Sequence, residues 1–166
     1  MKYLIFLFLL TCLKTFANGP VNFAPKYPNF ISPSSKSYFI QHNDAEIFQV
    51  KVLKTKEDLA KGFSGIKSEQ VGAHQGLFFW FSDDELRHFW MPNTFFNLMI
   101  IFLNKDLVVT NIVKDAPMHP GMDEKKNKIY RAPVVNAKYV MELKSESDLA
   151  KNIEVGSRFK WIKGQP

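Results

Sequence analysis

The chain has 166 residues, with 22 Lys and Arg against 16 Asp and Glu, so its formal net charge is +6 at pH 7. Hydrophobic residues make up 46% and charged residues 23%, which is ordinary for a globular protein and excludes global disorder. Eight glycines exclude a collagen-like sequence. The length suits one domain with a targeting segment, and 16 phenylalanines predict a core rich in aromatic rings.

Residues 1–17 have the pattern of a secretory signal peptide. Lys2 supplies the positive charge, residues 3–13 form an almost unbroken apolar run, and Thr15 and Ala17 are small residues that suit a cleavage site. We therefore expect the protein to be periplasmic or secreted after cleavage, with no transmembrane helix in its mature form.

Two alternatives compete with a cleaved signal peptide. One is an uncleaved anchor, although the apolar run is short for a bilayer. The other is a lipoprotein, because Leu10, Thr11 and Cys12 loosely resemble a lipobox. Cys12 is the only cysteine, so the core of a mature chain must hold without a disulfide. The lysines are scattered rather than clustered, which argues against nucleic acid as the main partner.

Residues 18–37 hold four prolines among serines and one glycine, a composition that cannot sustain a helix or a central strand. We interpret this segment as an extended linker. Its aromatic residues, Phe23, Tyr27 and Phe30, are expected to dock on the domain or on a partner. The folded domain is expected over residues 38–163.

Short strands are predicted from Tyr38 onward, because apolar residues alternate there and again over residues 47–52, with a turn at residues 42–44. Thr55 is a predicted N-cap of a short helix that ends at Gly62. In that helix region, Leu59, Ala60 and Phe63 are expected to face the core.

The remaining elements follow in chain order. Strands are predicted over residues 76–81, 86–91, 98–103, 107–113, 137–143 and 158–162, turns over 82–85 and 104–106, a long loop over 115–128, and a second short helix over 145–150. Strands dominate and their connections are short. The pattern predicts a mainly β fold, a small antiparallel β-sandwich or barrel-like domain with one or two short helices.

Several motifs in this order resemble the bacterial and archaeal DUF192 family, an uncharacterised group of small and often exported domains. They are Lys61-Gly62-Phe63-Ser64, Gly76-Leu77-Phe78-Phe79-Trp80-Phe81, Phe89-Trp90-Met91-Pro92-Asn93-Thr94, Ile100-Ile101-Phe102-Leu103, Ala116-Pro117, Tyr139-Val140-Met141-Glu142-Leu143 and Val155-Gly156. The similarity covers roughly residues 49–162, and the Trp-Met-x-Asn-Thr pattern is its most specific part. It implies a mainly β, sandwich-like domain and no particular activity.

The chain departs from this family at two places. The family usually has Arg-Gly-Leu where this chain has Lys61, Gly62 and Phe63, and Leu-Asp where this chain has Leu98 and Met99. An Asp at the second place would be a natural acid, base or ligand. Since Met99 cannot ionise, a mechanism that needs that carboxylate is in doubt.

The candidate ligand site groups Trp90, Asn93 and Thr94 at the edge of a pocket, with Lys61 and His88 as further members. The indole would stack on a ligand ring, and the amide and hydroxyl would orient it. The structural alternative makes Trp90 a core residue and places Asn93 and Thr94 in a local turn. The residues by themselves leave both interpretations open.

Lys61 and Ser64 have the residue types of a Ser–Lys nucleophilic pair, but ordinary C-capping explains them better. Met118, His119 and Met122 would suit copper(I), against the alternative of solvated loop side chains. The acidic runs at residues 83–85 and 123–124 are interpreted as exposed turns.

These observations favour an exported small-ligand-binding or accessory domain of unknown ligand, with a small-molecule or envelope ligand as its partner. The alternatives are a cell-envelope enzyme acting on a small polar or glycan substrate and a periplasmic copper-binding protein. No triad, phosphate loop or zinc motif is found, which counts against an enzyme. The sequence points to no cofactor, no metal site and no oligomeric state.

Overall fold

The computed structural model describes residues 30–31, 36–125, 127–162 and 166. In chain order its elements are β1 (Tyr38–His42), β2 (Ile47–Leu53), α1 (Lys56–Lys61), η1 (Ser68–Gln70), β3 (Gln75–Arg87), β4 (Leu98–Leu103), β5 (Val109–Ala116), β6 (Val135–Lys144), η2 (Asp148–Ala150) and β7 (Phe159–Trp161). The elements labelled η are single 3-10 turns. The predicted mainly β class is therefore confirmed.

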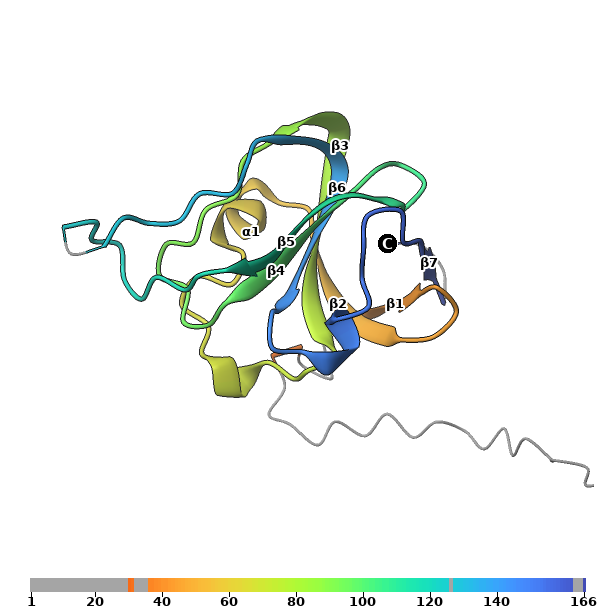
Figure 1. The fold of residues 1–166 in the computed structure, drawn as a ribbon, viewed down its shortest axis with the longest axis horizontal. Helices are drawn as coiled ribbons and strands as arrows, with labels where there is room; N and C mark the ends of the chain where they lie inside the picture. Colours follow the sequence, from red (N-terminus) through yellow and green to blue (C-terminus); the bar gives the residue numbers. More distant parts are fainter. Residues whose placement is uncertain (1–29, 32–35, 126, 163–165) are drawn as a thin grey trace, which may run out of the picture.

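The strands form one curled sheet in the order β5-β4-β6-β3-β2-β1-β7 (Figure 1). Neighbouring strands are antiparallel except β2 and β3, which are parallel because the chain returns through α1 and η1 before β3 begins. The two ends of the sheet touch where Val109 N donates to Ser157 O at 2.9 Å and Phe159 N donates to Leu107 O at 2.9 Å. The sheet is thus curled into a half-barrel.

Both faces of the sheet are buried. Side chains of β4 alternate strictly, with Met99, Ile101 and Leu103 on one face and Leu98, Ile100 and Phe102 on the other. All six are buried. A strand that is apolar at every position is expected when both faces are covered, which explains the unbroken apolar run.

The first face lines the inside of the curl, and we call its cluster the inner core. It contains residues of all seven strands, including Ile40, Phe48, Phe78, Met141 and Phe159. Aromatic rings pack within it, with Phe78 and Trp161 at a centroid distance of 4.9 Å. The predicted aromatic core is found here.

The second face carries what we call the outer core. Here Leu77, Phe79, Ile100 and Phe102 of the sheet are covered by connecting segments that contribute Phe63, Val71, Met91, Phe96, Ile129 and Ala132. Figure 1 shows α1 on this side and the long connection between β5 and β6 extending away from the sheet. Because loops rather than a second sheet cover this face, pockets can form between them.

Local sequence rules account for α1. The Thr55 side chain accepts a hydrogen bond from Asp58 N at 3.1 Å, as an N-cap residue does, and Gly62 ends the helix with φ at +48°. Phe63 is buried and Leu59 is half-buried. Ala60 is exposed, so its predicted place in the core is wrong: none of the six residues of α1 is buried, and Ala60 lines a pocket instead.

Three other predicted elements differ. Residues 82–85 are not a turn between two strands but part of the continuous strand β3, which bulges between Trp80 and Glu85 while it stays paired with β6. The strand predicted over residues 86–91 is wrong beyond Arg87, where β3 ends, because only Trp90 forms an isolated bridge. The second helix is only the 3-10 turn η2. The hairpin of β4 and β5 and the strands β1, β2, β6 and β7 are confirmed within a few residues.

The predicted signal peptide at residues 1–17, with Cys12, lies outside the described residues, as do Phe23 and Tyr27 of the predicted linker. Phe30 does dock on the domain, since its ring lies 5.2 Å from that of Phe63 and its N–H donates to Gln70 O at 3.1 Å. Within the part of the chain that the structure describes, no helix has the length and apolar character to cross a bilayer.

Candidate functional site

A pocket of about 320 Å³ opens in the outer core, between α1 and the segment that runs from the end of β3 to Leu98. Its aromatic walls are Phe63, Phe79, Phe81, Phe89 and Trp90, and its polar or charged lining residues are Lys61, Ser64, Arg87, His88, Thr94 and Glu142. We call it the Glu142 pocket. Its size lies at the small end of the range for ligand sites, and its mixed lining is typical of them.

Glu142 is the most unusual residue of the pocket. It lies on β6, opposite Leu77 of β3 and Ile100 of β4, and only 4% of it is exposed. Its Oε2 has no hydrogen-bond partner among the described residues. Burial raises the pKa of the carboxyl from 4.5 to about 8, so at neutral pH the group is mostly protonated and uncharged.

Gly62 keeps the space in front of this carboxyl open. A Cβ at this position would lie 3.3 Å from Phe79 Cζ and 3.4 Å from Glu142 Oε2. The positive φ of Gly62 also disfavours any larger residue. The C-terminal end of α1 therefore brings a glycine and the neighbouring Lys61 to the pocket together.

Four of the five predicted site residues line this pocket: Lys61, His88, Trp90 and Thr94. Trp90 is 45% exposed, so it is a wall of the pocket and not a core residue. Its backbone pairs with Arg131 in an isolated bridge, and the Arg131 guanidinium lies 5.6 Å from the indole centroid. Thr94 is 3% exposed, and its hydroxyl donates to Pro92 O at 3.2 Å.

Asn93 is not among the residues that line the pocket. It has φ at +50°, its N–H donates to Gly121 O at 2.6 Å, and its carbonyl accepts from Gly65 N at 2.9 Å. These are the features of a turn residue that ties three segments together. The structure therefore places the indole of Trp90 and the side chain of Thr94 at one pocket without the Asn93 amide, and the turn alternative describes Asn93 and also the bond from the Thr94 hydroxyl to Pro92 O.

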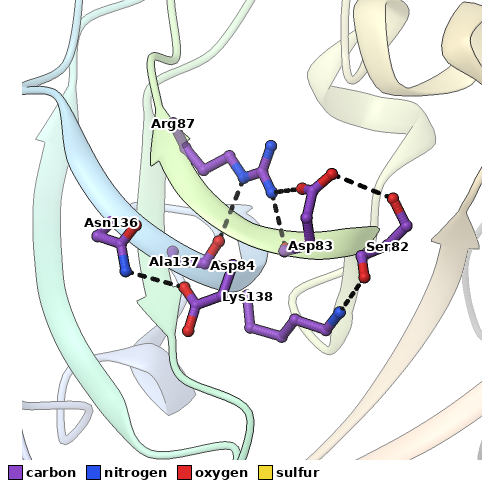
Figure 2. A network of polar contacts seen from close by, with 7 residues as sticks. All are labelled: Ser82, Asp83, Asp84, Arg87, Asn136, Ala137 and Lys138. Atoms are coloured by element: carbon purple, nitrogen blue, oxygen red, sulfur yellow. Dashed lines mark hydrogen bonds and ion pairs between the residues drawn. The ribbon is translucent and has the colours of Figure 1, made fainter.

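Arg87 and Glu142 line the pocket but were not predicted as site residues. Arg87 is fixed by the β3 bulge (Figure 2): Nε donates to Ala137 O at 3.2 Å, and Nη2 donates to Asp83 O at 2.8 Å and to the Asp83 carboxylate. This ion pair keeps the pKa of the Asp83 carboxyl below its usual value. The bulge also places the guanidinium 3.9 Å from the Phe81 ring centroid.

The same bulge is tied to β6 by two further contacts. Asn136 Nδ2 donates to Asp84 Oδ1 at 3.0 Å, and Lys138 Nζ donates to Ser82 O at 2.6 Å (Figure 2). Bulges re-aim side chains near sites in this way. The acidic run at residues 83–85 is thus exposed, as predicted, but Asp83 also positions Arg87.

The Ser–Lys pair gains no geometric support. Lys61 and Ser64 both line the pocket, but the bond between them joins backbone groups, with Ser64 N donating to Lys61 O at 2.9 Å. This is the C-capping arrangement.

The residues considered for copper lie in the loop between β5 and β6. Met118 and His119 line a second hollow in the loop between β5 and β6, and Met122 is not part of its lining. The ring of His119 bonds Asp123 O at 3.1 Å through Nε2, and its backbone pairs with Thr94. Within the described residues no cluster of three or more His, Cys, Asp or Glu could hold a metal ion.

Met99 does not face the Glu142 pocket. It lies in the inner core, on the opposite face of β4 from Leu98. An Asp at this position would therefore point away from the pocket, so its replacement removes no group from this site. The carboxyl that the pocket does contain comes from β6.

The fold is shared with two solved structures. A candidate transcription regulator from Sinorhizobium meliloti 1021 is similar with a TM-score of 0.61 and 20% sequence identity, over 78% of this chain and 97% of that chain. A protein of unknown function from Novosphingobium aromaticivorans DSM 12444 is similar with a TM-score of 0.59 and 24% identity, over 78% and 90%. At these identities the likeness shows the fold alone.

Among curated proteins, none matches the chain. The model of the family DUF192, described as "Uncharacterized ACR", matches residues 38–161. This match spans every strand from β1 to β7 and includes the Glu142 pocket. The resemblance found in the sequence motifs is confirmed, and the chain belongs to the DUF192 family.

Proposed function

We propose that this domain binds a small molecule in the Glu142 pocket. The observation that carries the proposal is Glu142 itself, a buried carboxyl with no partner for Oε2 among the described residues. A polar group buried without a hydrogen bond costs about 1–3 kcal/mol. A ligand that hydrogen-bonds to this carboxyl would recover that cost, and Gly62 leaves room for it.

Binding fits the geometry better than catalysis does. A catalytic carboxyl is normally oriented by a second group within hydrogen-bond reach. The structure describes no such neighbour for Glu142. The partly exposed indole of Trp90 and the aromatic walls supply stacking surface, which favours recognition of a flat or apolar ligand body.

We also propose that the domain is exported after cleavage of its signal peptide. The apolar run and the small residues before position 18 support cleavage after Ala17. The domain would then act in the periplasm or outside the cell. Mass spectrometry of the chain expressed in a Gram-negative host tests this: a mature protein that begins at Asn18 in the exported fraction is expected, and an intact Met1 in the cytoplasm would contradict it.

A thermal-shift screen of small polar and aromatic compounds on the full chain tests ligand binding. A compound that binds the folded state raises the melting temperature according to its concentration and affinity. Each active compound is then tested on Gly62→Ala, in which the new methyl group would occupy the space beside Glu142 and Phe79.

Gly65→Ala is the matched control. Gly65 has φ at +81°, so alanine is strained there too, but its Cβ would meet only Asn93 Nδ2, at 3.6 Å. We expect active compounds to stabilise the wild type and Gly65→Ala and to lose their effect on Gly62→Ala. Equal stabilisation of both variants would place the binding elsewhere and refute the proposal, as would a screen without any active compound.

A further inference from the structure

Hydrogen-bond donors outnumber acceptors in the Glu142 pocket. The ammonium of Lys61 makes no ion pair within the described part of the chain, and the indole N–H of Trp90 has no acceptor there. Arg87 uses Nε and Nη2 for the bulge, which leaves the two N–H groups of Nη1 without a described acceptor. Figure 2 shows Nη1 pointing away from the three acceptors that hold the other nitrogens.

We propose that the ligand of this pocket is a small monocarboxylate and that Arg87 binds its carboxylate. The inference rests on the proposed function, since it names the ligand class of the same site. A guanidinium recognises carboxylates well because it is planar, permanently charged and rich in donors.

The bulge makes Arg87 suitable for this role. Three hydrogen bonds and the contact with Phe81 hold the guanidinium in one orientation, and the Arg87 side chain is only 12% exposed. A side chain that is already ordered loses little entropy when a ligand binds. The part of β3 beyond Trp80 thus places the ordered guanidinium of Arg87 at the rim of the pocket.

The charged residues that line the pocket together with Glu142 favour an anion over a cation. Lys61 comes from α1, and Arg87 and His88 come from the end of β3, whereas no acidic residue other than Glu142 lines the pocket. A cationic ligand would therefore meet two positive side chains. Because Asp83 already neutralises part of the Arg87 charge, the pocket matches one negative charge rather than the two of a phosphate monoester.

Glu142 is compatible with an anion when it is protonated. Two carboxyl groups that share a small site retain one proton between them, because like charges close together disfavour double ionisation. The protonated Glu142 can then donate a hydrogen bond to the ligand. Carboxylate affinity is accordingly expected to fall as pH rises and Glu142 ionises.

Four probes with the same ring test the ligand class: benzoate, benzamide, benzamidine and phenyl phosphate. Each is titrated into the full chain at about pH 6, where Glu142 is protonated, and binding is followed by the melting temperature and the Trp90 indole N–H resonance. We expect benzoate to bind most tightly, benzamide more weakly and benzamidine least. Benzoate affinity should decrease between about pH 7 and pH 9.

Arg87→Gln tests the assigned residue and should weaken benzoate binding by about tenfold or more, since charge-assisted hydrogen bonds are lost. Lys138→Gln is its control, because Lys138 also ties the bulge but does not line the pocket. Its benzoate affinity should stay unchanged. The melting temperatures of the ligand-free variants show whether each one is folded. If a variant does not fold, the comparison of the four probes on the wild type still tests the ligand class.

The outcomes separate the two proposals. Tighter binding of benzamidine or phenyl phosphate than of benzoate, at the Trp90 signal, would overturn the monocarboxylate class and leave small-molecule binding intact. Unchanged benzoate affinity of folded Arg87→Gln would overturn the role of Arg87. If none of the four probes changes the Trp90 resonance or the melting temperature at millimolar concentration, the monocarboxylate inference fails, whereas the proposed function fails only if the wider thermal-shift screen also yields no active compound.

Discussion

The two faces of the curled sheet are built from the same strands, yet they differ in chemistry. The inner core is closed mainly by the strands, and its cluster consists of apolar and aromatic side chains such as Phe78, Met141 and Phe159. The buried His42 lies at its edge, with its ring 5.2 Å from that of Phe159. The outer core is closed by α1 and loops, and it admits Glu142, a buried carboxyl. The strands enclose a continuous apolar cluster on the inner face, whereas α1 and the loops over the outer face leave a pocket whose lining can be polar.

This comparison assigns stability to the inner face and binding to the outer face. Substitutions in the inner core should lower the free energy of unfolding without changing the affinity for any ligand. Substitutions around Glu142 should change the pH dependence of the free energy of unfolding and the affinity for a ligand. Four measurements test that division, from the largest expected effect to the smallest.

The largest effect is the pH dependence that Glu142 imposes. Its folded pKa of about 8 is above the unfolded value near 4.5, so the folded state binds the additional proton between these pH values. The free energy of unfolding is therefore highest below about pH 4.5 and falls as pH rises to about 8, by an amount on the order of 5 kcal/mol.

Urea unfolding of the wild type and Glu142→Gln at about pH 5 and pH 9 measures this term. Glutamine is close in shape to the protonated carboxyl and does not titrate. The two proteins should have similar stability at the lower pH, and the variant should be the more stable one at the higher pH. Parallel pH profiles would show that Glu142 is not titrating in a buried site.

The next effect compares two adjacent phenylalanines of β3. Phe78 points into the inner core, where its ring lies 5.4 Å from that of Tyr139, and Phe79 points outward into the pocket wall. Phe78→Ala should cost about 4 kcal/mol because it leaves a dry cavity. Phe79→Ala should cost about 1 kcal/mol less, because the space joins the pocket and can be filled by water. Chemical denaturation measures both losses of unfolding free energy. A larger loss for Phe79→Ala than for Phe78→Ala would contradict the assignment of stability to the inner face.

Gly76→Ala tests how closely the strands approach. A Cβ on this β3 glycine would lie 2.5 Å from Leu143 Cδ2 and 2.7 Å from the Glu142 carbonyl oxygen. The second contact is with backbone, which cannot rotate away, so we expect a loss of about 2 kcal/mol. The same variant should displace β6 near Glu142 and change its titration, which an NMR pH titration can follow. Unchanged stability would show that the sheet adjusts more easily than its contacts suggest.

The smallest effect concerns α1. Thr55→Ala removes the acceptor for Asp58 N and should cost about 1 kcal/mol of folding free energy, measured by thermal unfolding. Because α1 presents Lys61 and Gly62 to the pocket, ligand affinity should fall as well, whereas the inner core should keep its amide exchange protection. Loss of protection throughout the inner core would show that the two faces are not independent.

Local patterns were sufficient for most of the fold. The alternation of apolar residues located β1 and β2, the N-cap Thr55 located α1, and the turn at residues 104–106 located the hairpin of β4 and β5. The bulge was missed because residues 82–85 have the composition of a turn. Pairing with β6 on both sides of the bulge, together with the contacts from Asn136 and Lys138, holds them in β3, and such contacts are non-local.

The candidate site was predictable only in part, for the same reason. The sequence determined that Trp90 and Thr94 belong together, because they are four residues apart in one short segment, and it determined the mainly β class through residue periodicity. It gave no reason to select Glu142, since a charged residue in an alternating strand normally faces water. Tertiary structure decided otherwise: α1 and loops cover the outer face, bury that carboxyl beside Gly62 and bring Lys61 and Arg87 to the same pocket from distant parts of the chain.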